Sequence, residues 1–370
     1  MAEYKTLVKK IPISPSDKTK QKEYLNEGEL AIVDQGHSLI VGYTNDTDKT
    51  VSCELPVIVF GDHTRAVKYV NFPFGAGADG IKILQPKEII HPKYLYYGTQ
   101  YIIAKMPSKG YARHYQYVEK EDLPVPDIDE QERIVSRIEE LFSQLDAGVE
   151  TLKKVKEQLY VYQQAVLKDT FSICDSQLEL SKLCEHVTDG DHMPPPKAES
   201  GIPFIMIANI KNNLIDWEST AYVRKDYYDN IDIKRKPING DVLYTVTGSF
   251  GIPVMIDFNK EFCFQRHIAL IRPSSDVLQK YLYYALMSPD VYAQASKVAT
   301  GTAQKTVGLT VLRKIKIPFV NEKSVQCKIV SALERKLSFC ATISNTIDEV
   351  LKQSDNMKNS ILINAFEKDI

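Results

Sequence analysis

Two places in the sequence bring a carboxylate close to an imidazole, a pairing that serves general-base catalysis and metal binding. One is Asp62-His63, and the other runs from Asp189 to His192. Neither place offers a third ligand or a nucleophile at a recognisable spacing. We therefore expect no catalytic residue and no metal site, and we expect these residues to cap turns or to contact a binding partner.

A glycine-rich run at residues 75–80 fits the G-x-G-x-x-G pattern of dinucleotide-binding turns. In a dinucleotide site this pattern opens a helix, whose N-terminus binds the phosphate. Here the run is followed by the strand-like residues 81–84 and by Pro86. The pattern therefore predicts a glycine-rich turn, and we expect no bound cofactor.

Pro126-Asp127 could begin a nuclease motif, in which an acidic residue, any residue and a lysine follow at strand spacing. No such acidic-x-Lys follows here, so the nuclease interpretation is excluded.

Cysteine usage and hydropathy limit the class of protein. No C-x-x-C pair is present, which argues against a zinc site and against a disulfide framework. No apolar run approaches the roughly 18 residues of a membrane helix, and the N-terminus lacks the apolar segment of a signal peptide. We predict a cytoplasmic protein without a membrane segment. The cysteines expected to be reduced and structural are Cys53, Cys174, Cys184, Cys263, Cys327 and Cys340.

The charge of the chain is balanced. Its 370 residues include 46 basic and 48 acidic side chains, which gives a net charge of -2. The balance also holds locally, with 16 basic and 16 acidic groups in residues 1–127 and with 17 and 16 in residues 174–320. Lys and Arg supply much of the affinity of proteins for nucleic acids by neutralising phosphates. A nucleic-acid function must therefore be argued from the organisation of the chain.

The sequence contains two copies of one plan. The segment at residues 93–97 and the segment at 280–284 are both KYLYY, and at the same offset of 187 the run IKILQP matches IALIRP. Such a repeat constrains the whole architecture. Two later matches, at offsets of 192 and 195, relate residues 123–126 to 315–318 and residues 134–136 to 329–331.

Each copy is predicted to be a strand-rich domain followed by one long helix. Asp129 is expected to cap the first helix, with Glu132 completing a capping box. From there apolar residues alternate steps of four and three, which is the spacing of a heptad seam. The first seam consists of Ile134, Ile138, Leu141, Leu145, Leu152, Val155 and Leu159, and continues to Tyr162 and Val166. The second seam consists of Ile329, Leu333, Cys340, Ile343, Ile347, Val350, Met357 and Ile361, with polar lapses at Lys336 and Ser354.

The two seams are not identical, because the first contains Gly148, and this favours their packing on each other. We predict an α+β fold, in which two strand-rich mixed α/β domains are separated by two long helices. The helices are expected to form an intramolecular antiparallel coiled coil, and the repeat to have pseudo-twofold symmetry. The predicted boundaries are 1–126 for the first domain, 127–173 for the first helix, 174–318 for the second domain and 319–370 for the second helix.

A set of motifs in a fixed order carries a family resemblance. In the first copy they are PVIVFGDHTR at 56–65, GADG at 77–80, RHY at 113–115, LPVP at 123–126 and EQERIV at 130–135. In the second copy they are TDGDH at 188–192, GIPFI at 201–205, GDVL at 240–243, TGSFG at 247–251 and RHIA at 266–269. Along nearly the whole chain this set resembles the specificity subunits of Type I restriction-modification enzymes.

The resemblance implies a non-catalytic subunit in which each domain is a target-recognition domain reading one half of a split double-stranded DNA site. It also implies two partner modification subunits, which carry the S-adenosylmethionine-dependent adenine methyltransferase and dock on the helices. Restriction subunits, which translocate and cut DNA, would join through them. The sequence itself contains neither the methyltransferase signature Asn-Pro-Pro-Tyr nor a P-loop.

The first copy departs from the family pattern at its start. Only 27 residues precede its matched Gly28-Glu29, whereas about 60 residues lie between Leu180 and the corresponding Gly240 of the second copy. We therefore expect the first recognition domain to have an abbreviated start.

Base reading requires Arg or Lys for guanine, Asn or Gln for adenine, and small hydroxyl or apolar groups near thymine. Loops with such groups occur in both copies. The alternative that remains open is a coiled-coil adaptor of duplicated domains that binds protein only. The candidate DNA contacts are His63, Thr64, Arg65, Arg113 and His114 in the first copy, and His192, Lys197, Thr247, Ser249, Phe250, Thr302, Gln304 and Lys305 in the second.

Overall fold

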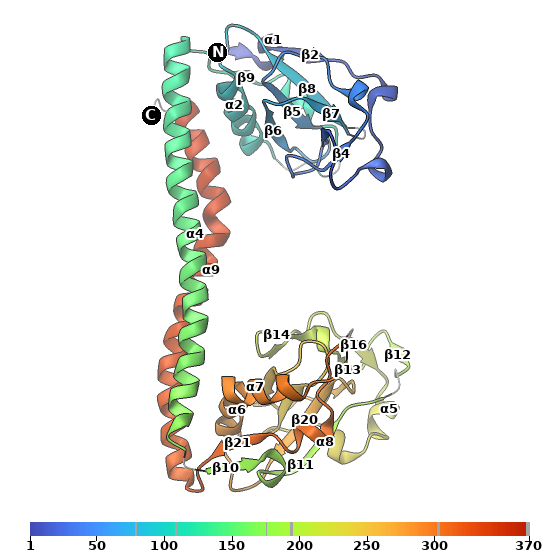
Figure 1. Ribbon diagram of the computed structural model, residues 1–370, viewed down its shortest axis with the longest axis vertical. Coiled ribbons are helices and arrows are strands. Elements are labelled where there is room, and N and C mark those ends of the chain that lie inside the picture. Colours follow the sequence, from blue (N-terminus) through green and yellow to red (C-terminus); the bar gives the residue numbers. More distant parts are fainter. Residues whose placement is uncertain are drawn as a thin grey trace. The chain divides into compact units, whose positions relative to one another are not determined.

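The computed structural model describes the whole chain apart from residues 78–79, 108–109, 111, 175, 193–194, 302–303 and 368–370. The chain divides into two units, Met1–Lys153 with Asp348–Ile370, and Lys154–Ile347. The two long helices predicted from the heptad seams are present as α4 (Ile128–Ser172) and α9 (Lys323–Glu367) (Figure 1). Each unit contains one sequence copy and a segment of each long helix.

The first unit is built on an antiparallel sheet whose central strand is apolar throughout. The sheet has the order β2 (Val8–Ile11), β8 (Ile81–Pro86), β5 (Val57–Gly61) and β6 (Val67–Val70). Because side chains alternate along a strand, β5 divides its residues between two cores. Val57 and Val59 face one core, and Ile58 and Phe60 face the other, all without solvent exposure.

Each face of this sheet is covered by a different layer. The first core also contains residues of a smaller sheet, whose strand β3 runs parallel to β7. The second core contains residues of α2 and of both long helices. The remaining elements are β3 (Leu30–Val33), β4 (Gly42–Thr44), β7 (Phe74–Ala76), β1 (Ala2–Glu3) with its partner β9 (Asp122–Leu123), α1 (Tyr4–Leu7), α2 (Pro92–Lys105), α3 (Tyr115–Val118) and the 3-10 turns η1 (Pro15–Asp17), η2 (Gln21–Glu23) and η3 (Thr47–Lys49).

The second unit repeats this arrangement. Its main antiparallel sheet has the order β11 (Cys184–Asp189), β20 (Ile268–Pro273), β17 (Val242–Thr245) and β18 (Pro253–Met255). Val242 and Tyr244 of β17 face the core shared with the helices, and Leu243 faces the core shared with the smaller sheet. The strand alternation therefore separates two cores here as well.

The smaller sheet of the second unit has the order β12-β16-β13-β19, and β13 runs parallel to β19 as β3 does to β7. The remaining elements are β12 (Lys197–Ala198), β13 (Ile202–Ile205), β16 (Ala221–Val223), β19 (Cys263–Phe264), the hairpin β14 (Ile210–Lys211) and β15 (Leu214–Ile215), β10 (Ser176–Glu179) with its partner β21 (Lys316–Phe319), α5 (Lys225–Asp229), α6 (Gln279–Met287), α7 (Pro289–Val298), α8 (Leu309–Leu312) and the 3-10 turns η4 (Leu180–Lys182), η5 (Ile207–Asn209) and η6 (Ile233–Arg235).

The repeated topology corrects one prediction. Gly240 precedes β17, whose counterpart in the first unit is β5, whereas Gly28 precedes β3 of the smaller sheet. Gly28 therefore corresponds to Gly201, which precedes β13, and its match to Gly240 is wrong. The abbreviated start rested on that match. In the first unit, β1, α1 and β2 occupy the places that β10, η4 and β11 occupy in the second.

The start of α4 corrects a second prediction. The helix begins at Ile128, and its cap is Asp127, whose Oδ1 accepts a hydrogen bond from the backbone N–H of Glu130 at 2.9 Å. Asp129 lies inside the first turn, where a negative charge is favoured by the helix dipole. The predicted capping box of Asp129 and Glu132 is therefore wrong, because an equivalent acceptor two residues earlier starts the helix sooner.

The long helices run antiparallel in the first unit. Lys358 of α9 forms an ion pair with Asp146 of α4 at 2.8 Å, and its ammonium lies 5.5 Å from the centre of the Phe142 ring. Further along α9, Leu362 shares a core with Ile138, which lies earlier in α4. In the second unit the end of α4 shares a core with the start of α9. Within the described part of the chain, no helix has a stretch long and apolar enough to span a membrane.

Burial differs along the predicted seams. Most buried members lie where the helices meet the domains, whereas Cys340 and Ile347 are buried in the middle of α9; the other members are half-buried or exposed. This is expected of two helices that cover each other on one side only. The buried residues are Ile134, Ile138, Val166, Ile329, Leu333, Cys340 and Ile347; the half-buried ones are Leu141, Leu145, Leu152, Val155, Leu159, Ile343, Val350 and Ile361; Tyr162 and Met357 are exposed.

Phe366, near the end of α9, is buried on the first domain. Its ring stacks on Tyr101 at 5.0 Å between ring centres and lies 4.9 Å from the ring of Tyr94. We expect Phe366→Ala to lower the free energy of unfolding of the first unit by about 3–5 kcal/mol, as truncation of a buried aromatic residue does. Phe339→Ala, on the same helix at a side chain 67% exposed, should change it by less than about 0.5 kcal/mol. Urea unfolding of both variants checks this, and an equal loss in the two would contradict the packing.

Candidate nucleic-acid interface

Three loops of the second unit meet at one edge of its main sheet. The strand register pairs Asp189 with Ala269 and Thr245 with Ile268, so the end of β11, the start of β20 and the end of β17 lie together. The loops are joined by backbone hydrogen bonds, among them Arg266 N–H to the carbonyl of Asp191 at 3.0 Å. This edge is therefore a fixed platform for the side chains that follow the strands.

The loop that ends near Thr306 joins this edge. The Thr306 hydroxyl donates to the Thr247 hydroxyl at 3.3 Å, and Gly248 N–H donates to the carbonyl of Lys305 at 2.9 Å. Ser249, Gln304 and Lys305 are exposed beside one another as a result. The structure thus brings these three predicted contacts together, whereas Thr302 lies outside the described residues.

Two predicted contacts of this edge are buried. Thr247 and Phe250 are each only 8% exposed. The Phe250 ring stacks on Tyr292 of α7, with 5.7 Å between ring centres and 11° between planes. Thr247 and Phe250 therefore stabilise the loop from inside, because a buried side chain has no exposed surface with which to contact a base. The sequence shows residue types but not which face of a loop is covered.

The predicted contact His192 belongs to a charged cluster after β11. Its Nε2 lies 2.8 Å from Asp189 Oδ2, and Arg235 of η6 lies 3.5 Å from the other oxygen of Asp189. Tyr227 donates its hydroxyl to Asp191 at 2.5 Å, and burial together with this carboxylate raises the pKa of Tyr227 well above its usual value. The phenol therefore stays a neutral donor that fixes Asp191.

The motif glycine between these carboxylates is required by close packing. A Cβ atom on Gly190 would lie 1.9 Å from the carbonyl oxygen of Phe264. Any side chain here would displace the neighbouring strand. Among the residues that the structure describes, no group of three His, Cys, Asp or Glu side chains could hold a metal ion. Lys197 lies on β12 of the smaller sheet, and its side chain is exposed.

The corresponding edge of the first unit is organised around Asp62. Its N–H donates to the carbonyl of Gly80 at 2.6 Å, and its Oδ1 accepts from Tyr115 N–H at 2.9 Å. Its carbonyl accepts from the ring Nδ1 of His114 at 3.0 Å, and Lys82 lies 3.7 Å from its carboxylate. Asp62 thereby ties the loop after β5 to the residues before β8 and α3.

Most of the predicted contacts in the first unit take part in this scaffold. His114 is 2% exposed. Thr64 donates its hydroxyl to the carbonyl of Gln35, and His63 Nδ1 lies 3.3 Å from the carbonyl of Ala112. Arg65 adopts a φ of 61° and reaches the carbonyl of Met106 at 3.5 Å. Arg113 is exposed, and its side chain forms no hydrogen bond or ion pair within the described part of the chain.

Two further candidates for contact follow from the structure, one of which, Arg266, belongs to the RHIA motif but is not among the predicted contacts. Arg266 is exposed directly before β20, at the edge that carries Ser249 and Lys305. Gln35 lies at the first unit's edge, where a Cβ atom on Gly80 would be 2.5 Å from its Oε1. For Arg266, the signal was its position before the strand that repeats β8. For Gln35, the sequence held no signal, because it follows a strand of the smaller sheet.

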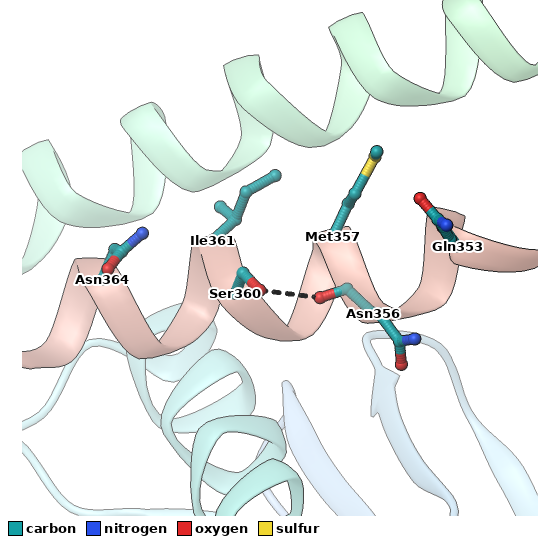
Figure 2. A pocket seen from close by; sticks show the side chains of 6 residues that line it. All are labelled: Gln353, Asn356, Met357, Ser360, Ile361 and Asn364. Atoms are coloured by element: carbon teal, nitrogen blue, oxygen red, sulfur yellow. Dashed lines mark hydrogen bonds between the residues drawn. The ribbon is translucent and has the colours of Figure 1, made fainter. Parts of the chain in front are cut away.

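Two surface hollows lie on the long helices. One is lined by α9 residues, and Figure 2 shows Met357 and Ile361 directed toward the neighbouring helix while Asn356 points away from it. The Ser360 hydroxyl donates to the carbonyl of Asn356 at 3.0 Å. Another lies on the charged outer face of α4, between Asp129 and Glu140. Neither has the enclosed, apolar form of a small-molecule site, so the sheet edges are the better candidates for recognition.

Comparison with known proteins gives a consistent result. Residues 183–353 match the family model of the Type I restriction modification DNA specificity domain. The chain is 25% identical over 367 residues to the Type I restriction enzyme EcoR124I/EcoR124II specificity subunit of Escherichia coli, covering 92% of this chain and 86% of that protein. It is 22% identical over 307 residues to the Type I restriction enzyme MjaVIII specificity subunit of Methanocaldococcus jannaschii, covering 75% and 71%.

Solved structures show a similar fold. The HsdS subunit from Thermoanaerobacter tengcongensis matches with a TM-score of 0.53 at 17% identity, covering 100% of this chain and 96% of that one. A chain from a structure describing complex assembly and conformational transition of the type I R-M system matches with a TM-score of 0.66 at 16% identity, covering 100% and 97%. The α+β fold with two long helices is therefore confirmed.

The neighbouring residues His114 and Arg113 have different roles in the first unit: His114 is buried in the scaffold of the edge, and Arg113 is exposed at its surface. We expect His114→Ala to lower the free energy of unfolding by about 1–3 kcal/mol, because it leaves the buried carbonyl of Asp62 without one of its donors. Arg113→Ala should change it by less than about 0.5 kcal/mol, as exposed substitutions do. Thermal and urea unfolding measure both, and a stable His114→Ala variant would contradict the role given to Asp62.

Proposed function

The chain belongs to the DNA specificity subunits of Type I restriction-modification systems. We propose that it reads a double-stranded DNA site in two halves, one with each recognition domain. The observation that carries the proposal is the repeated sheet edge. In both units the loops after the central strand and before its neighbour are locked by backbone hydrogen bonds. Each edge leaves a few polar side chains exposed, as base reading in a groove requires.

The residues proposed to contact DNA are those that the scaffold leaves available. In the second unit these are Ser249, Gln304 and Lys305, with Arg266 added from the structure. In the first unit Arg113 is the best candidate, whereas His63, Arg65 and the half-buried Gln35 lie beside it and belong to the scaffold of the edge. Gln suits adenine, and Arg or Lys suits guanine.

The chain has no catalytic role of its own in this family and works with the other subunits of the system. We propose that two modification subunits dock on its long helices and supply the S-adenosylmethionine-dependent adenine methyltransferase. Restriction subunits would join through them. We propose the cytoplasm as the place of action, because the substrate is double-stranded DNA.

The balanced charge supports a division of labour in DNA binding. Specific DNA binding draws heavily on phosphate neutralisation by basic side chains. The chain has a net charge of -2, and its edge carboxylates Asp62 and Asp189 already pair with Lys82 and Arg235. We propose that the modification subunits complete the phosphate contacts around the recognition domains.

The proposed function is tested by co-expressing the chain with a methyltransferase encoded beside it and mapping adenine methylation in genomic DNA. We expect methylation at one bipartite sequence. Gln304→Ala should lower modification of that site by roughly 5- to 150-fold, the loss of one bidentate base contact. Gln177→Ala, an exposed glutamine on β10 away from this edge, should leave it unchanged. Methylation that is absent or independent of sequence would favour a protein adaptor instead.

A second test uses the chain alone. Without its partners we expect dissociation constants in the range of non-specific complexes, about 10⁻⁴ to 10⁻⁶ M at physiological salt. Addition of the modification subunits should bring them into the range of specific complexes, about 10⁻⁸ to 10⁻¹¹ M. Fluorescence anisotropy with matched and scrambled duplexes measures both. Tight, sequence-specific binding by the chain alone would contradict the division of labour.

A further inference from the structure

Two glutamines occupy equivalent places at the starts of the long helices. Gln131 lies in the first turn of α4, and Gln326 lies in the first turn of α9, 195 residues later. Both are polar side chains with no solvent exposure at all. Burying an amide costs free energy unless the amide forms hydrogen bonds, so each glutamine is expected to bond the groups around it.

In the first unit Gln131 bonds three backbone groups. Its Oε1 accepts from the N–H of His91 at 2.7 Å, and its Nε2 donates to the carbonyls of Ile89 at 3.2 Å and Pro126 at 2.8 Å. His91 and Ile89 belong to the loop that leads into α2 of the recognition domain. Pro126 belongs to the linker that leads into α4. One side chain therefore fastens the domain, the linker and the helix together.

In the second unit Gln326 makes the same three bonds. Its Oε1 accepts from the N–H of Leu278 at 2.9 Å, and its Nε2 donates to the carbonyls of Asp276 at 3.0 Å and Val320 at 2.9 Å. Leu278 precedes α6 as His91 precedes α2. We refer to Gln131 and Gln326 with these partners as the two glutamine clamps.

The chemistry of the clamps requires glutamine. One acceptor and two donors on a planar amide match one N–H and two carbonyls. Glutamate would set a carboxylate against two carbonyl oxygens, asparagine is one carbon shorter, and an apolar residue would leave three backbone groups unpaired.

Further contacts at each joint are duplicated as well. Lys93 pairs with Glu139 at 2.7 Å, and Lys280 pairs with Glu334 at 2.5 Å. The hydroxyls of Tyr94 and Tyr281 each donate at 3.0 Å to a carbonyl of the segment that leads into the long helix, at Pro124 and at Pro318 of β21. The joint between domain and helix is thus built twice to the same design, whereas the loops at the sheet edges differ.

Reading a split site places a demand on these joints. Each base pair added between two half-sites moves one of them by about 3.4 Å and turns it by about 35° around the duplex axis. A domain that could swing on its helix by a comparable amount would accept neighbouring spacer lengths. A rigid joint is therefore needed for the spacer to be read.

We propose that Gln131 and Gln326 are positioning residues that hold each recognition domain at a fixed angle on its helix and so make the subunit selective for one spacer length. This inference rests on the proposed function. The clamps touch no candidate base contact, so they act on spacer selectivity and not on the identity of the half-sites.

The test uses the complex of full chain and modification subunits, with Gln131→Met and Gln326→Met as variants. Methionine keeps the volume of the side chain and removes all three hydrogen bonds. Methylation kcat/KM is measured on duplexes with the native spacer and with spacers one base pair shorter and longer. We expect the preference of the wild-type complex for the native spacer to fall by about tenfold or more in each variant, with discrimination against half-site mismatches retained.

Two controls separate positioning from loss of stability. Gln144→Met makes the same change at an exposed glutamine of α4 and should keep the native preference. Val59→Ala destabilises the first unit from the core on the other face of its main sheet, which contains no described residue of either long helix, and it should lower stability while spacer selectivity remains. If a methionine variant does not assemble, Lys93→Ala and Lys280→Ala, which break the duplicated ion pairs at the surface, are measured instead and should relax selectivity in part.

The outcomes are distinguishable. A wild-type complex that methylates no bipartite site would remove the proposed function itself. A wild-type complex with a spacer preference that the clamp variants and the lysine variants all retain would overturn the inference and leave the glutamines a structural role only. Loss of half-site discrimination together with spacer preference would also overturn it, because the clamps would then shape the reading edge.

Discussion

The structure depends on the packing of the ends of the long helices on α2 and α6, the helices that lie against the main sheets. Isolated helices gain little stability from their own hydrogen bonds, so α4 and α9 need this packing as much as the domains do. In the first unit Phe366, at the end of α9, lies against Tyr94; in the second, Phe171, at the end of α4, lies 5.5 Å from Tyr281. Each domain is thus completed by both helices, and neither helix can shift without opening a core.

This packing explains which features could be predicted from the sequence. The KYLYY segments were recognisable because Tyr94 and Tyr281 are fully buried against helix ends and donate hydrogen bonds to the carbonyls of Pro124 and Pro318, which occupy equivalent places in the two units. The same packing and hydrogen bonding are needed in both units, which accounts for the same residues in both segments. The two-residue match of Gly28 to Gly240 failed, because a glycine in a loop is required by its local turn and not by a packing contact that both units share. Asp127 and Asp129 were confused because either carboxylate can serve a helix start.

The candidate site was less predictable than the fold. Residue types suited to base reading are also the types that stabilise loops, and the sequence does not show which of the two roles each residue has. His114 and Phe250 proved to be buried, while Arg113 and Lys305 are exposed. The difference depends on long-range contacts, such as Asp62 with Tyr115 and Phe250 with Tyr292. Only the folded arrangement of distant segments determines these.

The two units share the same joints and central strands but differ at their sheet edges, and this difference affects which DNA sequence each edge would read. The joints and central strands are alike in the two units, but α2 runs unbroken to Lys105 where the second unit breaks at Ser288-Pro289 into α6 and α7. Proline at the first position of a helix sets the new direction of α7. That direction brings Tyr292 onto Phe250 and supports the loop of Ser249. Under the proposed function the two edges therefore present different groups to DNA, and the two half-sites must differ in sequence.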